Sequence, residues 1–215
     1  LTTAAQIASK FRADGVDIAV GIATPTAQAL VSAIDDIPVV FTAVTDPVAA
    51  ELVPGYSGGG GNVAGYSDLT PVREQIELLA QLGNVESIGH VYSSGEANAV
   101  VLAEMAREVA GELGIEFVEA TVANSAEVRQ AALSIVDRVD VFYMSTDNTV
   151  VSALSSLTDV AMDAGVPVVT ADPSSAETQD VIAAYGFDYY TMGRATGRLI
   201  DEILRGADPD DIPVR

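Results

Sequence analysis

The stretch SIGHVYSSGEANAVVLAEMAREVAGELG, residues 87–114, contains the structural unit that recurs along the chain. Residues 87–92 form a short apolar run typical of a buried strand, and a polar turn follows at residues 93–96. Residues 97–113 have the spacing of an amphipathic helix, and glycine at position 114 is the residue type that most often ends a helix. The apolar positions expected to face the sheet are Val100, Val101, Met105, Val109 and Leu113. This order predicts one strand-to-helix unit of a parallel sheet.

The same order of strand, turn and helix recurs on both sides of this stretch. Further strands are predicted at residues 16–23, 39–44, 116–121, 139–145 and 166–171, and helices at residues 2–13, 126–136, 149–164 and 189–205. Because the strands are nearly continuous apolar runs, we expect helices to cover both faces of each sheet. The sequence therefore predicts an α/β fold built on parallel sheets, and 215 residues suffice for one large domain or two lobes.

The composition excludes several classes of function. The chain has 31 acidic and 10 basic residues and a net charge of −21, so a nucleic acid would be repelled. It has no cysteine, which removes disulfides, thiolate catalysis and sulfur-ligated metals. The single histidine, His90, lies inside a predicted strand with no partner of metal-binding type, so we interpret it as structural. No cofactor or metal site is predicted.

Two segments break the rhythm of strands and helices. A glycine-rich loop at residues 57–61 leads into residues 62–68, and a second apolar segment occupies residues 181–188. We interpret both as crossings between two lobes, near Tyr66 and Gly186. One lobe then comprises residues 1–66 with residues 189–215, and the other comprises residues 67–188. Since the chain opens in a helix with no strand before it, we expect the first lobe to be incomplete.

Polar residues follow the carboxyl ends of the predicted strands. In open parallel sheets ligands bind at this edge, where helix N-termini present free N–H groups. Each hydroxyl or acid there could equally be an ordinary helix cap. Together, however, the hydroxyls and N–H groups suit a carboxylate, and Asp147 or Asp172 suits an ammonium group, which are the two charged groups of an α-amino acid. The candidate ligand-binding residues are Thr24, Thr26, Ala43, Thr45, Asp46, Tyr92, Ser93, Glu96, Asp147, Asn148, Asp172 and Asp188.

Four motifs give the chain a resemblance to a known family. They are FTAVTDPVAA at residues 41–50, GGNVAGYSD at residues 60–68, TDNT at residues 146–149 and YGFDYY at residues 185–190. With them the chain resembles the ABC-transporter substrate-binding proteins that include tryptophan, tyrosine and phenylalanine binders. The resemblance implies a periplasmic-binding-protein type I fold, in which two Rossmann-like lobes close over a ligand by a hinge motion.

The same resemblance implies which strand ends hold the ligand. By position, Thr24, Thr26, Ala43 and Thr45 of the first lobe match residues that hold the carboxylate. The second-lobe matches are Tyr92, Ser93, Glu96, Asp147, Asn148 and Asp172, which are expected to hold the ammonium group and line the side-chain pocket. Aromatic residues near these positions or near the crossings could stack on an aromatic ligand, or could fill the core and the hinge. They are Tyr56, Tyr66, Tyr92, Phe187 and Tyr189.

These observations predict a non-enzymatic, extracytoplasmic solute-binding subunit of an ABC importer that binds an amino acid, with an aromatic one preferred. The expected partners are the small ligand and an ABC permease, and the expected form is a monomer, either periplasmic or anchored as a lipoprotein. Two alternatives stay open at this point. One is a ligand-sensing domain of a regulatory or signalling protein with the same fold, and the other is an α/β enzyme that uses the same edge of the sheet.

Overall fold

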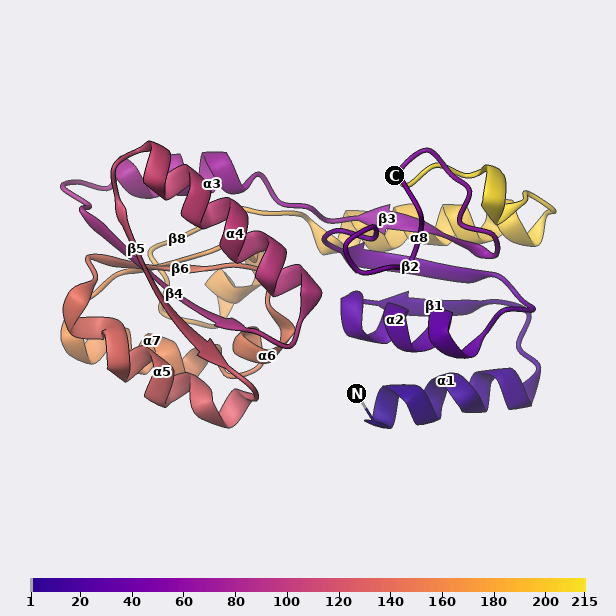
Figure 1. Cartoon of the computed structure of the whole chain (residues 1–215), viewed down its shortest axis with the longest axis horizontal. Coiled ribbons are helices and arrows are strands. Elements are labelled where there is room, and N and C mark those ends of the chain that lie inside the picture. Colours follow the sequence, from indigo (N-terminus) through magenta and orange to yellow (C-terminus); the bar gives the residue numbers. More distant parts are fainter. Residues whose placement is uncertain (1) are drawn as a thin grey trace. The chain divides into compact units, whose positions relative to one another are not determined.

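The structure is a computed structural model that describes residues 2–215, with the side chain of Thr2 left aside (Figure 1). The chain forms two compact units, each built from parallel strands and helices. Unit 1 comprises Leu1–Leu69 and Asp188–Arg215, and unit 2 comprises Thr70–Phe187. The chain therefore passes from one unit to the other at residues 69–70 and again at residues 187–188. Within the described residues, none of the helices has the length and apolar character that a membrane span needs.

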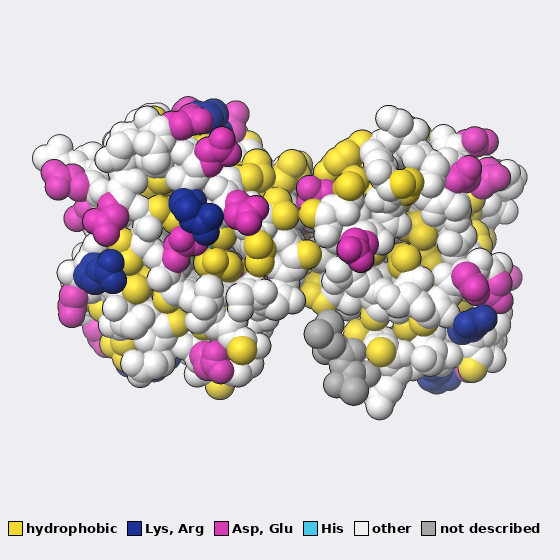
Figure 2. Space-filling model, in the orientation of Figure 1, with side chains coloured by type: hydrophobic (Ala, Val, Ile, Leu, Met, Phe, Trp, Pro, Cys, Tyr) yellow, Lys and Arg dark blue, Asp and Glu magenta, His cyan; other side chains and the backbone are white. Residues whose placement is uncertain are grey.

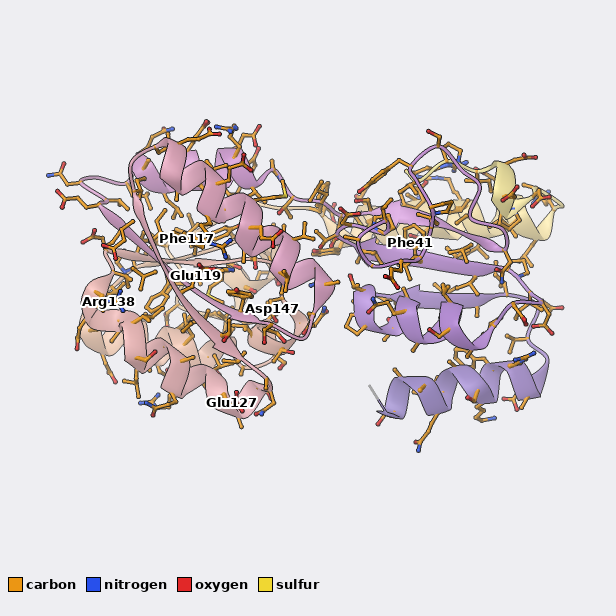
Figure 3. All side chains as sticks on the ribbon, in the orientation of Figure 1. Phe41, Phe117, Glu119, Glu127, Arg138 and Asp147 are labelled. Atoms are coloured by element: carbon orange, nitrogen blue, oxygen red, sulfur yellow. The ribbon has the colours of Figure 1, made fainter. Side chains whose placement is uncertain are left out.

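Unit 1 has a three-stranded parallel sheet in the order β1-β2-β3. Its strands are β1 (Ala19–Ile22), β2 (Val39–Val44) and β3 (Val63–Ser67), and its helices are α1 (Thr2–Asp14), α2 (Thr24–Ala33), α8 (Tyr189–Leu204) and the short 3-10 turn Pro209–Asp211. Alternate residues of β2 face opposite sides, as strand geometry requires. Phe41 packs in the cluster with Ala27 and Leu30 of α2, whereas Val40 packs with Leu199 of α8 (Figure 3).

Unit 2 has a five-stranded parallel sheet in the order β5-β4-β6-β7-β8. The strands are β4 (Ser87–Ser93), β5 (Glu116–Val122), β6 (Val141–Met144), β7 (Val168–Thr170) and β8 (Ala183–Ala184). The helices are α3 (Val72–Ala80), α4 (Ala97–Glu112), α5 (Val128–Ile135), α6 (Asn148–Val151) and α7 (Leu154–Ala164), with 3-10 turns at Ser125–Glu127, Val136–Arg138 and Pro173–Glu177. Helices α3 and α4 cover one face, and α5 and α7 cover the other (Figure 1).

The strand order of unit 2 places a topological switch point between β4 and β6. The chain runs from β4 outward to β5 and then returns past β4 to β6, so the connections after β4 and after β6 leave on opposite sides of the sheet. This is the doubly wound order in which ligands bind where the connections diverge. The α/β class with parallel sheets that the sequence predicts is confirmed.

Two local predictions in unit 2 are wrong. The continuous helix expected at residues 149–164 is interrupted at Ser152 and Ala153, where the Ser152 hydroxyl donates to the carbonyl oxygen of Thr149 and α6 ends. The buried face of α4 is also rotated from the expected stripe, because Leu113 is 42% exposed while small residues turn inward. Those inward residues are Ala99, Leu102, Ala103, Ala106, Val109 and Ala110. Alanines there allow the helix to lie close to the sheet.

The surface carries the charge imbalance expected from the composition. In Figure 2 Asp and Glu side chains are spread over the visible face of each unit, and Lys and Arg side chains are few. Several of the basic side chains are already paired with acids, as in Arg73 with Glu112 at 2.8 Å and Arg107 with Glu119 at 2.7 Å. These exposed pairs contribute little to stability, since solvent screens them.

Candidate functional site

The end of β1 in unit 1 combines a strained backbone with an uncapped helix. Ala23 occupies the N-cap position of α2 with φ 71° and ψ 155°, a region that alanine rarely adopts. No side chain caps α2, and Pro25 in its first turn has no N–H group. Thr24 is buried, and Thr26 donates its hydroxyl to the carbonyl oxygens of Ile22 and Ala23. The first-turn N–H groups of α2 therefore have no anionic partner from a side chain.

The end of β2 lies beside it and is strained in the same way. Ala43 has φ 53°, and the pairing of β2 with β3 shifts register between Phe41 and Val44. A left-handed alanine costs about 1–2 kcal/mol relative to an ordinary conformation. Since β1 and β2 are neighbouring parallel strands, Ala23 and Ala43 end at the same edge of the sheet. Backbone strain at such an edge is a feature of functional sites.

A buried carboxylate that the sequence prediction missed lies behind this edge. Asp68 is 3% exposed, and its Oδ1 accepts a hydrogen bond from the hydroxyl of Thr45 at 3.3 Å. Its Oδ2 accepts one from the phenol of Tyr189 at 2.9 Å. Burial raises the pKa of Asp68, although both hydrogen bonds act in the opposite direction. Asp68 closes the motif at residues 60–68, but its pairing with Thr45 depends on sheet register that the sequence does not give.

Two other acids predicted for this site organise turns of unit 1. Asp46 Oδ1 accepts from the N–H groups of Val48 and Ala49 and from the phenol of Tyr56 at 3.1 Å. Asp188 caps α8 by accepting from the N–H groups of the first turn and from the Thr191 hydroxyl, and these bonds lower its pKa. Both carboxylates therefore stabilise the local backbone.

In unit 2 the predicted residues that follow β4 and β6 meet at the switch point. Asp147 (Figure 3) accepts from the N–H group of Ser93 at 2.6 Å and from that of Val150 at 2.9 Å. Glu96 accepts from the side-chain amide of Asn148 at 2.7 Å and from the N–H group of Thr149 at 2.8 Å. Both carboxylates thus occupy the N-terminal end of α6. Burial raises the pKa of Asp147 to about 6.

Three buried polar atoms near the end of β6 have no hydrogen-bond partner among the described residues. They are Asn98 Oδ1, Ser145 Oγ and Thr146 Oγ1. The Asn98 side chain is held in place because its amide donates to the carbonyl oxygen of Thr146 at 2.9 Å. Buried polar atoms are normally satisfied, so these atoms are suited to bind a polar group. Asn98 was not predicted, because inside a helix it has no local signal of function.

Tyr92 and Asp172 contact other groups than the carboxylates at the switch point. The Tyr92 ring stacks on His90 with a centroid distance of 5.4 Å, and burial raises the pKa of its phenol. Asp172 follows β7, where it caps a 3-10 turn by accepting from the N–H and hydroxyl of Ser174 and from the hydroxyl of Ser175. Asp172 is 9% exposed, and Asp147 is 1% exposed.

His90 is fully buried in an aromatic column, as expected for a structural histidine. Three rings surround it at centroid distances of 5.4–5.5 Å: Tyr92 of β4 itself, Tyr143 of β6 and Phe117 of β5. Figure 3 labels Phe117. The Nδ1 atom of His90 lies 2.8 Å from the carbonyl oxygen of Tyr143, which can only accept, so Nδ1 carries the proton. Nε2 has no partner in the described part of the chain, and burial lowers the pKa of His90 to about 4.

Comparison with known proteins settles the family. The family model for ABC transporter substrate binding proteins matches residues 1–215. The chain belongs to this family. It is also 37% identical over its whole length to a tyrosine-binding protein of Clostridioides difficile strain R20291, of which it spans 62%.

Two solved structures extend the comparison. A conserved domain protein from Vibrio cholerae is 48% identical with a TM-score of 0.96, over 99% of this chain and 72% of that one. The ABC domain in complex with L-Trp from Streptococcus pneumonia is 34% identical with a TM-score of 0.96, over all of this chain and 72% of that one. The predicted family and the periplasmic-binding-protein type I-like fold of Rossmann-like lobes are both confirmed.

Proposed function

We propose that this chain binds an aromatic amino acid as the extracytoplasmic solute-binding subunit of an ABC importer. The observation that carries the proposal is the placement of polar groups at the carboxyl ends of the parallel strands in both units. A tyrosine binder and an L-Trp complex among the similar proteins support the choice of an aromatic ligand. The role is one of binding, without catalysis.

The uncapped helix α2 is the proposed site for the ligand's carboxylate. A helix N-terminus attracts anions through its free N–H groups and its dipole, and α2 has no side-chain cap of its own. The corresponding end of α6 in unit 2 is already filled by Asp147 and Glu96. A ligand carboxylate is therefore favoured at Thr24 and Thr26, with the strained backbone at Ala43 beside it.

The proposed partners of the ligand's ammonium group are carboxylates of unit 2. Asp172 is more exposed than Asp147 and receives one backbone N–H group and two serine hydroxyls, whereas Asp147 receives two backbone N–H groups. We therefore assign the ammonium to Asp172 in the first place, with Asp147 as its substitute. Charge-assisted hydrogen bonds of this kind are roughly twice as strong as those between neutral groups.

In this proposal the transport partner is an ABC permease that recognises the ligand-bound form. Ligand contacts that exist only in one conformation favour that conformation, and the permease then binds it. The protein acts as a monomer in the periplasm or as a lipoprotein anchored outside the cell.

A thermal-shift screen of the intact protein against the proteinogenic amino acids tests the proposal. A ligand at 100 times its dissociation constant stabilises the folded state by about 2.7 kcal/mol, so the melting temperature should rise measurably. We expect a rise with Trp, Tyr or Phe that calorimetry confirms as binding. A flat profile for all amino acids would refute amino-acid binding, and a rise confined to aliphatic amino acids would refute the aromatic assignment.

A further inference from the structure

Asp68 connects the ligand-binding edge of unit 1 to the segment that re-enters this unit. It follows β3 directly, and its own N–H group donates to the carbonyl oxygen of Val44 at 3.1 Å. Its carboxylate accepts from the Thr45 hydroxyl, just beyond β2, and from the Tyr189 phenol at the start of α8. The Thr45 carbonyl oxygen is held as well, because the Ser67 hydroxyl donates to it at 2.8 Å. Thr45 is thus fixed at both its side chain and its backbone.

The direction of these hydrogen bonds decides what Thr45 can bind. An ionised carboxylate has no proton to give, so the hydroxyls of Thr45 and Tyr189 must both donate to Asp68. A threonine hydroxyl has one proton, and here Asp68 receives it. The lone pairs of Thr45 Oγ1 then remain as acceptors, and they suit a donor such as an ammonium group rather than a carboxylate. The buried negative charge of Asp68 favours a cationic group at the same place.

We propose that Asp68 is a positioning residue of the ligand site: it orients the Thr45 hydroxyl as an acceptor for the ligand's ammonium group. The inference rests on the proposed amino-acid function, and it changes the role of Thr45 from a carboxylate partner to an ammonium partner. The carboxylate stays with the N-terminus of α2. Asp68 does not touch the ligand, and its effect on affinity passes through Thr45.

A double-mutant cycle on the intact protein tests this coupling. The variants are Asp68→Asn, Thr45→Val and the double variant, with binding of L-Trp, L-Tyr and L-Phe measured by calorimetry. Loss of a hydrogen bond to a charged group corresponds to about a 10- to 150-fold loss of affinity, which we expect for Thr45→Val and for Asp68→Asn. In the Thr45→Val background, Asp68→Asn should cause no further loss, because the residue through which it acts is gone.

Two further measurements separate positioning from a general structural role. Thr45→Ser keeps the hydroxyl and should restore nearly full affinity. The deaminated analogue of the ligand has no ammonium group, so Asp68→Asn should not weaken its binding. Asp36→Asn, which removes an exposed acid from the same unit, is the control for charge and should bind as the wild type does.

The possible outcomes are distinguishable. Asp68→Asn could lower the affinity equally in the wild-type and Thr45→Val backgrounds, or could lower the affinity for the deaminated analogue as much as that for the amino acid. Either result would show that Asp68 only maintains the fold. It would overturn the inference and leave the proposed function standing. Unchanged affinity in Asp68→Asn would overturn it as well. If the wild-type protein binds none of the three amino acids, the proposed function fails and the inference fails with it. If Asp68→Asn does not fold, the two Thr45 variants still test the ammonium contact. Thr45→Val should then bind the amino acid more weakly than Thr45→Ser does, and both should bind the deaminated analogue equally; equal affinities for the amino acid would overturn the inference.

Discussion

The two units differ in backbone conformation and in helix capping at the carboxyl edge of their parallel sheets. In unit 1 the strand ends hold Ala23 and Ala43 with positive φ, and α2 starts without a side-chain cap. In unit 2 no residue other than glycine has a positive φ in the described chain, and the helix end beside the switch point is filled by Asp147 and Glu96. Unit 1 therefore leaves backbone N–H groups at the start of α2 free for an anion, whereas in unit 2 carboxylates already occupy the helix end.

Under the proposed function, this difference suits the two opposite charges of an amino acid. A carboxylate is attracted to free N–H groups at a helix N-terminus, and an ammonium group is attracted to carboxylates. Had both units used capped helices, the ligand's carboxylate would have to compete with Asp or Glu for the same N–H groups.

The largest expected effect concerns the packing that supports the strained edge of unit 1. A Cβ atom on Gly65 of β3 would lie 2.2 Å from the carbonyl oxygen of Phe41, where the register of β2 shifts. Because backbone cannot move aside there, we expect Gly65→Ala to lower the free energy of unfolding by about 3 kcal/mol or more. In unit 2 a Cβ on Gly89 would meet side-chain atoms only, the Phe142 ring at 3.0 Å and Val139 Cγ1 at 3.1 Å, so Gly89→Ala should cost about 1 kcal/mol.

Urea denaturation of both variants measures this comparison. Gly197→Ala, in the open space along α8, is the control and should raise stability by up to about 1 kcal/mol through helix propensity. If Gly65→Ala and Gly89→Ala lower the free energy of unfolding equally, the contact between β2 and β3 at Gly65 is no tighter than the packing around Gly89 in unit 2.

The next largest effect is expected from a variant of unit 2 that tests whether Asp172 binds the ligand or only caps its own turn. Asp172→Asn keeps an acceptor for the Ser174 N–H group but removes the charge, so we expect amino-acid affinity to fall by about 1.5–3 kcal/mol, or about 10- to 150-fold. Calorimetry on the intact protein measures the change, and Asp163→Asn on the exposed side of α7 is the matched control. Unchanged affinity would exclude Asp172 as an ammonium partner and would leave Asp147 or Glu96 as the acidic partner, in addition to the proposed Thr45 hydroxyl.

The fold could be predicted from the sequence largely because strands and helices have different apolar periods. The strand at residues 39–44 has the predicted bounds, and the helix at residues 97–113 differs from the structure by one residue. The strand ends also follow from topology, and for that reason the sequence predicts Ser93, Glu96, Asp147 and Asn148 at the carboxyl edge of the sheet, where hydrogen bonds join them in the structure.

The details of the site could not be predicted, for two physical reasons. Positive φ at Ala23 and Ala43 has no sequence signal, since alanine is not the residue type expected there. Contacts such as Thr45 with Asp68, or Asn98 with Thr146, join residues that are 23 and 48 positions apart, and sheet register decides which of them meet. Register is set by tertiary packing that a single sequence does not specify.

Two buried titratable groups of unit 2, His90 and Asp147, should affect the pH dependence of stability. The pKa of His90 is lowered to about 4 by burial, so the unfolded chain binds the extra proton first and stability is lost as pH falls from about 6.5 to 4. The pKa of Asp147 is raised to about 6 by burial, so the folded chain binds its proton first and stability is gained as pH falls from about 6 to 4. Each group changes the free energy of unfolding by about 1.4 kcal/mol per pH unit in its range, and the two contributions have opposite signs.

Single variants separate these two slopes. His90→Asn keeps an N–H group for the Tyr143 carbonyl oxygen but cannot titrate, so its stability relative to wild type should rise by about 1.4 kcal/mol per pH unit on acidification below about pH 6. Asp147→Asn should show the opposite relative slope. Urea denaturation between about pH 4 and 7 measures both. Parallel pH profiles for wild type and His90→Asn would contradict a buried neutral histidine.

The smallest expected effect comes from relieving the backbone strain at Ala43, which has a positive φ. Gly adopts positive φ without steric cost, so Ala43→Gly should raise the free energy of unfolding by about 1 kcal/mol if the strain at the end of β2 is real. Ala171→Gly, at the end of β7 in unit 2, relieves no positive φ and should lower stability by about 0.5–1 kcal/mol. Chemical denaturation of the pair gives the sign of each change. If Ala43→Gly also binds the amino acid more weakly, the strained alanine holds the backbone ready for the ligand, and the glycine variant loses that order. If both glycine variants are destabilised alike, the edge of unit 1 stores no strain, and only its uncapped helix distinguishes it from unit 2.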